Sequence, residues 1–370
     1  MKLVIIKFPH DVPQFFEDVC TMAENLAYDI TAVVSLEKNP ATTSIKGYPV
    51  VPLTKIYDLQ WDVAILVDGG NFFDDFVDKM VAWKIGTREQ FKNSFWLLKQ
   101  FMIKKYEDCA DPVIQETMKF WQTNDFSVFN QHLDFNVGIS DFVFLDDQCN
   151  LPYIHFKTVS GDWRKMYYPQ DEKFYTYKGK KVLSNLMKEQ EPTSPHLYTT
   201  AKHDVHAGDI VIDAGVCEGN FALKYVDICS KIYLFEPDQR WYEPLKQTFK
   251  DYRDKVEIFP CFVSDITEHN VTRIDDALPN LRGKNIFLKM DVEGSEPDAL
   301  RGAENLLTNN RVRASICTYH NADDLVRVKS ILQRFGFTTS TSDGYMVFVF
   351  DRNIYRTADF RKGVVRAVNF

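Results

Sequence analysis

The sequence predicts an α/β protein whose main part is a Rossmann-like sheet ending in an antiparallel hairpin, preceded by a smaller α/β accessory domain. Residues 209–223 run from an apolar strand through a glycine-containing turn into a helix, and residues 285–306 repeat that order. Residues 338–351 predict two strands about the turn Asp343-Gly344. Strands alternating with helices favour a parallel sheet, and the last two strands add an antiparallel edge.

Length and composition narrow the class of protein. A chain of 370 residues predicts two domains, and 45% hydrophobic with 26% charged residues is typical of globular proteins. A net charge of −8 argues against binding nucleic acid or an anionic membrane surface. The opening MKLVIIK has too short an apolar run for a signal peptide or a membrane span. We therefore expect a cytoplasmic protein.

The seven cysteines are scattered and form no C-x-x-C pair, which argues against a zinc site and against a disulfide framework. His203 and His206 in KHDVH could face one another on a helix, but nothing nearby completes a set of ligands. We therefore predict reduced cysteines and no metal.

The first 71 residues alternate strands and helices: KLVIIKF, ITAVVS and DVAILVD predict strands, and VPQFFEDVCTMAENLAY a helix. After the first strand, FPHDVP contains no glycine and two prolines, so a bound dinucleotide is not expected there. Gly69-Gly70 could form a binding turn or an unliganded loop. Residues 87–131 have aromatic stripes at helical spacing, residues 141–195 look irregular, and Pro192 and Pro195 indicate a domain boundary.

The turn within residues 209–223 has the chemistry of a cofactor loop. Asp213 ends the strand, and Gly215 and Gly219 permit a tight turn and a close approach of the backbone. Glu236 ends the next strand 23 residues after Asp213, close to the roughly 20 that bring a carboxylate to a ribose. Cys217 stands where a pyrophosphate site needs glycine, which favours a ligand without phosphate such as S-adenosylmethionine. An ordinary turn without a ligand is the alternative.

Charged residues gather at the end of the strand in residues 285–306. Lys289, Asp291 and Glu293 alternate and so lean to one side of the sheet, and Gly294 allows the turn that follows. His320 follows the β-rich run RASICTY and should reach the same carboxyl edge, where open α/β sheets bind ligands. These residues predict a site, although a solvated turn and a loop histidine are the alternatives.

With these segments the sequence resembles the FkbM family of S-adenosylmethionine-dependent methyltransferases. The resemblance lies in VIDAGVCEGNFAL, LFEPD, TRIDDAL, FLKMDVEGSEPDALRGAENLL and SICTYHNADDL, and it spans about residues 198–350. It implies the class I methyltransferase sheet and O-methylation, frequently of sugars in glycans or glycosylated metabolites. Cys217-Glu218 departs from the small or amide residues that the family often has there.

The domains and the roles of individual residues follow from spacing and resemblance together. We expect an accessory domain in 1–86, a helical and irregular connecting region in 87–195, and the methyltransferase domain in 196–370. Asp291 or His320 would act as the general base, Lys289 would orient the acceptor or hold a carboxylate in place, and Glu293 would bind the acceptor's hydroxyls. The predicted cofactor-binding residues are Asp213, Gly215, Glu218, Gly219, Glu236 on the ribose, and Asp265 at the adenine amino group.

Two other functions share parts of this pattern. A nicotinamide-dependent oxidoreductase shares the strand, loop and ribose carboxylate, but it would need the missing middle glycine. A non-catalytic binding protein could use the same scaffold. The acceptor could be a small molecule or a glycan, and the aromatic helices before the main sheet could form a homodimer surface.

Overall fold

The computed structural model describes residues 1–7, 13–67, 73–127, 143–171, 176–177, 180–181, 189–351 and 353–370. Its contacts divide the chain into two compact units. The N-terminal unit comprises Met1–Gln131 and Val347–Phe360, and the C-terminal unit comprises His132–Met346 and Arg361–Phe370. The chain thus leaves the C-terminal unit near its end and returns to it for the last ten residues.

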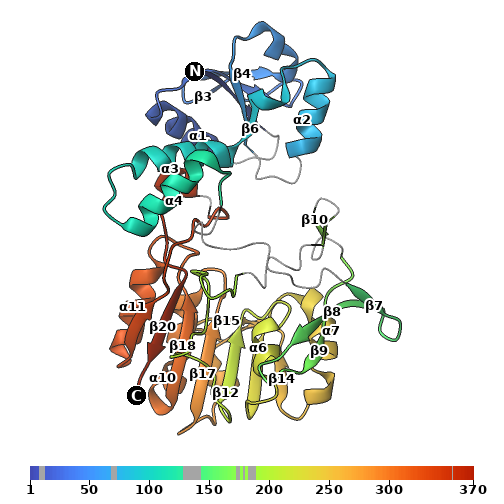
Figure 1. Cartoon of the computed structure of the whole chain (residues 1–370), viewed down its shortest axis with the longest axis vertical. Coiled ribbons are helices and arrows are strands. Elements are labelled where there is room, and N and C mark those ends of the chain that lie inside the picture. Colours follow the sequence, from blue (N-terminus) through green and yellow to red (C-terminus); the bar gives the residue numbers. More distant parts are fainter. Residues whose placement is uncertain are drawn as a thin grey trace. The chain divides into compact units, whose positions relative to one another are not determined.

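The N-terminal unit is built on a six-stranded sheet in the order β3-β4-β2-β1-β5-β6, parallel except for the β3–β4 pair (Figure 1). The strands are β1 (Lys2–Lys7), β2 (Asp29–Ser35), β3 (Ser44–Ile45), β4 (Tyr48–Pro52), β5 (Val63–Leu66) and β6 (Phe91–Asn93). The helices are α1 (Pro13–Asn25), α2 (Phe73–Ala82), α3 (Ser94–Lys105), α4 (Pro112–Thr123) and α12 (Ile354–Thr357), with 3-10 turns at Leu53–Asp58 and Arg88–Gln90. The α/β alternation predicted for the first 71 residues is confirmed, because β1, β2 and β5 carry buried apolar runs.

The returning segment Val347–Phe360 packs into the helical side of this unit. Ser94 and Tyr355 share a buried hydrogen bond of 2.6 Å between their hydroxyl oxygens. The ring of Phe15 meets Tyr355 edge-on, with 4.8 Å between centroids, and Phe360 stacks on Trp121. Residues more than 200 positions apart in the sequence therefore complete one core.

The C-terminal unit contains a seven-stranded sheet in the order β14-β13-β12-β17-β18-β20-β19 (Figure 1). The strands are β12 (Ile210–Ala214), β13 (Lys231–Phe235), β14 (Val256–Phe259), β17 (Asn285–Met290), β18 (Arg311–Cys317), β19 (Thr338–Thr341) and β20 (Val364–Val368). Pairs from β14 to β18 are parallel, and β20 is antiparallel to both neighbours. The helices are α6 (Asn220–Tyr225), α7 (Gln239–Thr248), α8 (Ile274–Ala277), α9 (Glu296–Arg301), α10 (Glu304–Asn309) and α11 (Asp324–Arg334), with a 3-10 turn at Lys250–Tyr252. This is the strand order of a class I methyltransferase sheet with one reversed strand near its edge, as the sequence predicts.

The antiparallel pair at the sheet edge is formed by different residues from those predicted. Residues 345–350 were expected to pair with 338–341, but Thr338–Thr341 pairs with Val364–Val368 instead. The apolar run after Gly344 leaves this sheet at Val347 and joins the N-terminal unit. Val364–Val368 offers the same apolar alternation and also pairs with β18, so it satisfies two ladders at once.

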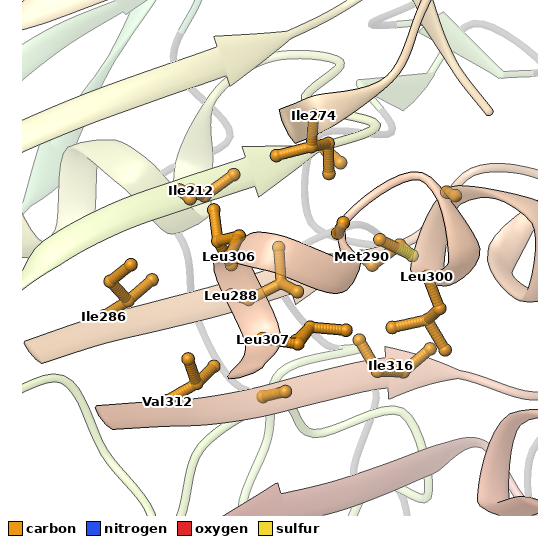
Figure 2. Packing of buried hydrophobic residues seen from close by; sticks show 14 of the residues in the cluster. Ile212, Ile274, Ile286, Leu288, Met290, Leu300, Leu306, Leu307, Val312 and Ile316 are labelled. Atoms are coloured by element: carbon orange, nitrogen blue, oxygen red, sulfur yellow. The ribbon is translucent and has the colours of Figure 1, made fainter. Parts of the chain in front are cut away.

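One core cluster of this unit lies between the parallel strands and helices α9, α10 and α11. The cluster contains Ile212, Leu288 and Leu307, which are completely buried. Figure 2 shows these side chains lying together with residues of β17, β18, α9 and α10. Completely burying such a side chain contributes on the order of 1.5–3 kcal/mol. Because the helices are fixed on the strands in this way, the loops that leave the strand ends have a rigid base.

Part of the segment that looked irregular forms a second, three-stranded antiparallel sheet in the order β7-β8-β9. The strands are β7 (Phe144–Asp146), β8 (Leu151–Lys157) and β9 (Trp163–Tyr167). Short pairs also join β10 (Thr176–Tyr177) to β11 (Lys180–Lys181) and β15 (Phe262–Val263) to β16 (Val271–Thr272). Tyr167 and Tyr168 are buried, which agrees with a packing role.

The structure does not test three of the expectations from the sequence: the division into domains, and the structures of FPHDVP and Gly69-Gly70. The division into 1–86, 87–195 and 196–370 stays a prediction of domains, beside the two units described above. FPHDVP overlaps residues 8–12, and Gly69-Gly70 falls within 68–72, both outside the described residues. Among the helices that the structure describes, none combines the length and the apolar character needed to cross a bilayer.

Candidate active site

The loops after β12 and β17 touch at the carboxyl edge of the large sheet. Gly215 has φ +76°, and a Cβ at this position would lie 1.7 Å from the carbonyl oxygen of Asp291. Only glycine therefore fits, since any side chain would force the two loops apart. Asp291 N in turn donates to Ala214 O at 3.0 Å, which holds the two strand ends in register.

Both loops contain left-handed residues that are not glycine. Cys217 has φ +48° and Glu293 has φ +55°, a conformation that L-residues other than asparagine and aspartate seldom adopt. Gly294 follows with φ +97°, where a Cβ would lie 2.6 Å from the side-chain nitrogen of Asn321 in the loop after β18. Backbone strain of this kind gathers at functional sites.

Beneath the two loops lies a buried ion pair. Asp213 is completely buried, and its Oδ1 lies 3.1 Å from Nζ of Lys289, which is 4% exposed. The ammonium group also donates to the carbonyl oxygen of Gly215. Burial raises the pKa of Asp213 and the charge of Lys289 opposes the rise. Lys289 thus connects β17 to the β12 loop from below.

Asp291 is surrounded by hydrogen-bond donors. Its Oδ2 accepts from the hydroxyl of Tyr198 at 2.7 Å and lies 3.3 Å from Nε2 of His196. Its Oδ1 accepts from the hydroxyl of Tyr319 at 3.1 Å and lies 3.4 Å from Nε2 of His320. Each carboxylate oxygen therefore faces one phenol and one imidazole.

A glutamate stands behind each of the two imidazoles. Nδ1 of His196 lies 3.1 Å from Oε2 of Glu189, and Nδ1 of His320 lies 3.1 Å from Oε1 of Glu296. We call these the His196 arm (Glu189 and His196) and the His320 arm (Glu296 and His320); both end at Asp291. In each arm the two ring nitrogens face carboxylates on opposite sides, so the imidazole bridges them.

These contacts set the charge of the groups. Burial alone would raise the pKa of Asp291, but the hydrogen bond and charge of His196 and the charges of Lys289 and His320 hold it well below its usual range. Burial alone would lower the pKa of His196, but Asp291 and Glu189 raise it to about 9. The pKa of His320 is likewise raised, against burial, by Glu296, Asp291 and Glu293. At neutral pH Asp291 is thus an anion beside the cations of His196 and Lys289.

Glu236 is the second carboxylate of the site. It is buried, its Oε2 accepts from the backbone nitrogen of Cys217 at 2.7 Å, and its Oε1 accepts from that of Asp238 at 2.9 Å. Burial raises the pKa of Glu236, and these two hydrogen bonds oppose the rise. Each oxygen keeps further lone pairs for a ligand.

A pocket of about 530 Å³, counting its open side, joins these groups. Its lining consists of Gly215, Cys217, Phe235, Glu236, Pro237, Cys261, Phe262, Val263, Asp291, Val292, Glu293 and Ser295. Phe235, Phe262 and Val263, from β13 and β15, contribute apolar side chains to the lining, and Asp291 and Glu293 contribute carboxylates. Such a pocket suits a ligand with a flat apolar part, hydroxyl groups and a positive charge.

The structure brings most of the predicted site residues together, but not all. Gly215, Glu236, Asp291 and Glu293 line the pocket, whereas Asp213, Lys289 and His320 lie directly behind it. Asp265 does not line the pocket, because its Oδ2 pairs with the Arg301 guanidinium at 3.1 Å.

Glu218 and Gly219, the other predicted cofactor-binding residues of the first loop, pack against the protein and do not line the pocket. Glu218 is buried outside the pocket lining, and burial raises its pKa to about 7. Gly219 has φ +81°, and a Cβ there would lie 3.0 Å from side-chain atoms of Leu245 and Phe249. Its lack of a side chain therefore serves the packing of α7. His203 shares a hydrogen bond with Ser315 in the core, and burial lowers its pKa to about 4.

Sequence reasoning missed five residues of the site: Glu189, His196, Tyr198, Glu296 and Tyr319. His196 and Tyr198 come just after the prolines that indicated a boundary, and nothing in that pattern points to Asp291. Tyr319 lies next to the predicted His320, and Glu296 lies in the strand, turn and helix predicted for residues 285–306, where it was given no role in the site. The polar residue Tyr319 beside His320 could have been noticed in the sequence, but only the folded structure shows that its partner is Asp291.

Comparisons with known proteins give one family match. Residues 250–339 match the family model described as the methyltransferase FkbM domain, a span that includes Asp291, Glu296 and His320. The match is shorter than the resemblance predicted for about 198–350, because it begins after β13. No curated protein matches the chain.

Three solved structures resemble the chain at low identity. A methyltransferase FkbM from Methylobacillus flagellatus KT is 15% identical, with a TM-score of 0.43 over 99% of this chain and 89% of that one. A precorrin-6y C5,15-methyltransferase from Geobacter metallireducens GS-15 is 9% identical, with 0.31 over 45% and 84%. A Streptococcus mutans protein in complex with SAH is 12% identical, with 0.30 over 45% and 91%. The assignment rests on the family match and on the strand order of the large sheet. Together these confirm the resemblance in the sequence: residues 250–339 match the methyltransferase FkbM domain and lie within a sheet of class I strand order, as expected of an S-adenosylmethionine-dependent methyltransferase.

Proposed function

We propose that the protein transfers a methyl group from S-adenosylmethionine to a hydroxyl group of a sugar or glycan-related acceptor. The observation that carries the proposal is Asp291, a carboxylate in the pocket lining backed by two imidazoles. A hydroxyl group is a weak nucleophile near neutral pH, so its methylation gains from groups that accept its proton. An acceptor with hydroxyl groups therefore fits this site.

The pocket residues fit the methyl donor. Glu236 has lone pairs left for the two ribose hydroxyls, and Phe262 and Val263 offer apolar surface to an adenine ring. Gly215 lets the backbone approach the amino-acid end, and the negative charge of Asp291 favours a sulfonium cation nearby. When bound, the donor supplies an electrophilic methyl group, so the protein's main tasks are alignment and exclusion of water.

Glu293 is placed to meet the acceptor. Its side chain is 83% exposed and belongs to the pocket lining, so it can accept hydrogen bonds from acceptor hydroxyls. Lys289 is 4% exposed and bound to Asp213 and Gly215. It supports the loops from beneath, which fits the second of its two predicted roles, holding a carboxylate in place, better than direct orientation of the acceptor. The sugar class itself is supported by the family resemblance.

Thermal stability with S-adenosylhomocysteine, with NAD as the control, tests the donor. A ligand at about a hundred times its dissociation constant stabilises the folded state by roughly 2.7 kcal/mol, which gives a clear rise in melting temperature. A shift with NAD alone would contradict the proposal. Transfer of labelled methyl groups to a panel of saccharides, with amine and thiol compounds as controls, tests the acceptor. Binding without transfer to any hydroxyl compound would favour a non-catalytic binding protein.

A further inference from the structure

The two arms at Asp291 end in different surroundings. Nε2 of His196 lies 3.3 Å from the hydroxyl of Tyr198 and 3.5 Å from Sγ of Cys317, both buried groups. Nε2 of His320 lies between Oδ1 of Asp291, at 3.4 Å, and Oε2 of Glu293, at 3.6 Å. Both arms reach Asp291, but His320 also faces Glu293, so the His320 arm meets two carboxylates of the pocket lining and the His196 arm meets one.

Glu296 fixes the orientation of His320. The glutamate is completely buried, and its Oε1 accepts from the backbone nitrogen of Val292 at 2.8 Å while facing Nδ1 of the imidazole. Glu296 lies closer to Nδ1, at 3.1 Å, than Asp291 and Glu293 lie to Nε2, at 3.4 and 3.6 Å, so the single hydrogen of the neutral ring is expected on Nδ1. The neutral imidazole therefore has its lone pair on Nε2, toward the pocket.

The Nε2 side of the ring is the side on which the proton of the acceptor would arrive. Oδ1 of Asp291 lies 3.4 Å from Nε2 and Oε2 of Glu293 lies 3.6 Å from it, and both residues line the pocket. An acceptor hydroxyl held by these carboxylates would therefore lie beside Nε2. A shared metal ion explains the cluster less well, because Asp291 and Glu296 face opposite nitrogens of the same ring.

We propose that Glu296 is a positioning residue that presents Nε2 of His320 to the pocket, so that His320 receives the proton leaving the acceptor while Asp291 remains a carboxylate. The inference rests on the proposed function. As the carbon–oxygen bond forms and the sulfur–carbon electron pair stays on sulfur, the acceptor O–H bond breaks. The proton reaches Nε2 past Oδ1 of Asp291, a new N–H bond forms, and the neutral imidazole becomes an imidazolium.

The charges around both groups agree with this division of roles. The donors around Asp291 hold its pKa well below the usual range, which makes it a poor proton store. The charged and polar groups that face His320 are Asp291 and Glu293 from the loop after β17, Glu296 from α9, Asp324 from α11, and Tyr319 with Arg361, which donates to the His320 carbonyl oxygen. Most of them are carboxylates, so a proton on His320 is stabilised.

Nitrogen NMR of the full-length protein with ¹⁵N-labelled histidine tests this without any acceptor. We expect neutral His320, assigned with His320→Gln, to carry its hydrogen on Nδ1 in the complex with S-adenosylhomocysteine. In Glu296→Gln its titration midpoint should fall by about one pH unit or more, because a carboxylate that favours the cation is lost. Glu189→Gln should move the titration of His196 instead.

Kinetics give a second readout. If His320 must be neutral to take up the proton, Glu296→Gln shifts the acid limb of the kcat profile to lower pH and lowers its plateau, with the KM for S-adenosylmethionine within twofold. Asp298→Asn, an exposed position on the same helix, should change neither.

The inference is wrong if neutral His320 in the wild type carries its hydrogen on Nε2, a measurement that needs no variant. It is also wrong if Glu296→Gln leaves the titration of His320 unchanged, and in both cases wild-type binding and transfer leave the proposed function standing. Failure of the wild type to bind S-adenosylhomocysteine would instead overturn the proposed function and this inference with it.

Discussion

Replacing Lys289 with methionine removes the positive charge that faces buried Asp213. The two groups are 3.1 Å apart, Asp213 is completely buried and Lys289 is 4% exposed, so water screens neither. Breaking such a pair strands a charge in the interior and typically costs about 3–5 kcal/mol. In a unit of this size about 1 kcal/mol shifts the melting temperature by roughly 2–4 °C. We therefore expect a fall on the order of 10 °C for the transition of the C-terminal unit.

The pH dependence of this loss has a defined sign. Burial already raises the pKa of Asp213, and removing Lys289 raises it further. A carboxyl group with a raised folded-state pKa destabilises the fold above its unfolded pKa and has no effect below it. The deficit of Lys289→Met should thus shrink as the pH falls from 7 toward about 4.

Scanning calorimetry, which separates the transitions of two units, measures both effects. Lys231→Met is a matched control, because Lys231 pairs with Glu257 at 3.8 Å with both side chains partly exposed, and we expect a change of about 0.5 kcal/mol or less. The double variant Asp213→Asn with Lys289→Met should recover much of the lost stability, since no buried charge is left alone. A Lys289→Met protein within about 1 kcal/mol of the wild type at pH 7 would refute the reasoning.

Three further substitutions test the pocket. Glu236→Ala removes a charged acceptor worth about 1.5–3 kcal/mol, so calorimetric titration should show S-adenosylhomocysteine binding at least tenfold more weakly, while Glu257→Ala on the next strand leaves it unchanged. Gly215→Ala should abolish binding and lower the melting temperature because its Cβ would lie 1.7 Å from the Asp291 carbonyl oxygen; Gly283→Ala, also left-handed but with open space around it, should keep binding intact. Asp265→Asn should change the affinity by less than about threefold because the carboxylate pairs with Arg301 away from the pocket, and a tenfold loss would instead support the adenine contact predicted from the sequence.

The sequence predicts the large sheet well because its strands are buried on both faces. Ile210–Ala214 and Asn285–Met290 are short apolar runs followed by polar residues, a pattern that few other structures produce. Glu236 and Asp291 followed from the same logic, since the carboxyl ends of parallel strands share one edge.

The errors concern partners that are far apart in the sequence. Val347–Phe350 is as apolar as a strand, but local pattern cannot show that Val364–Val368 competes for the same edge. His196 and Glu296 likewise have no local signature, because each gains its role only when three loops meet around Asp291. The adenine contact of Asp265 stays a prediction, which the pairing of its carboxylate with Arg301 does not favour.

The return of Val347–Phe360 to the first unit constrains the order in which the protein can be made. Ser94 forms its hydrogen bond with Tyr355, which is 261 residues later in the chain. During synthesis on the ribosome the N-terminal unit therefore stays incomplete until every strand of the large sheet except β20 has been made. Contacts between such distant residues slow folding. A fragment ending at residue 131 would leave Phe15 and Trp121 without the aromatic rings that cover them. The two units are therefore interdependent in biogenesis, and a nascent chain arrested before residue 347 is a natural substrate for chaperones.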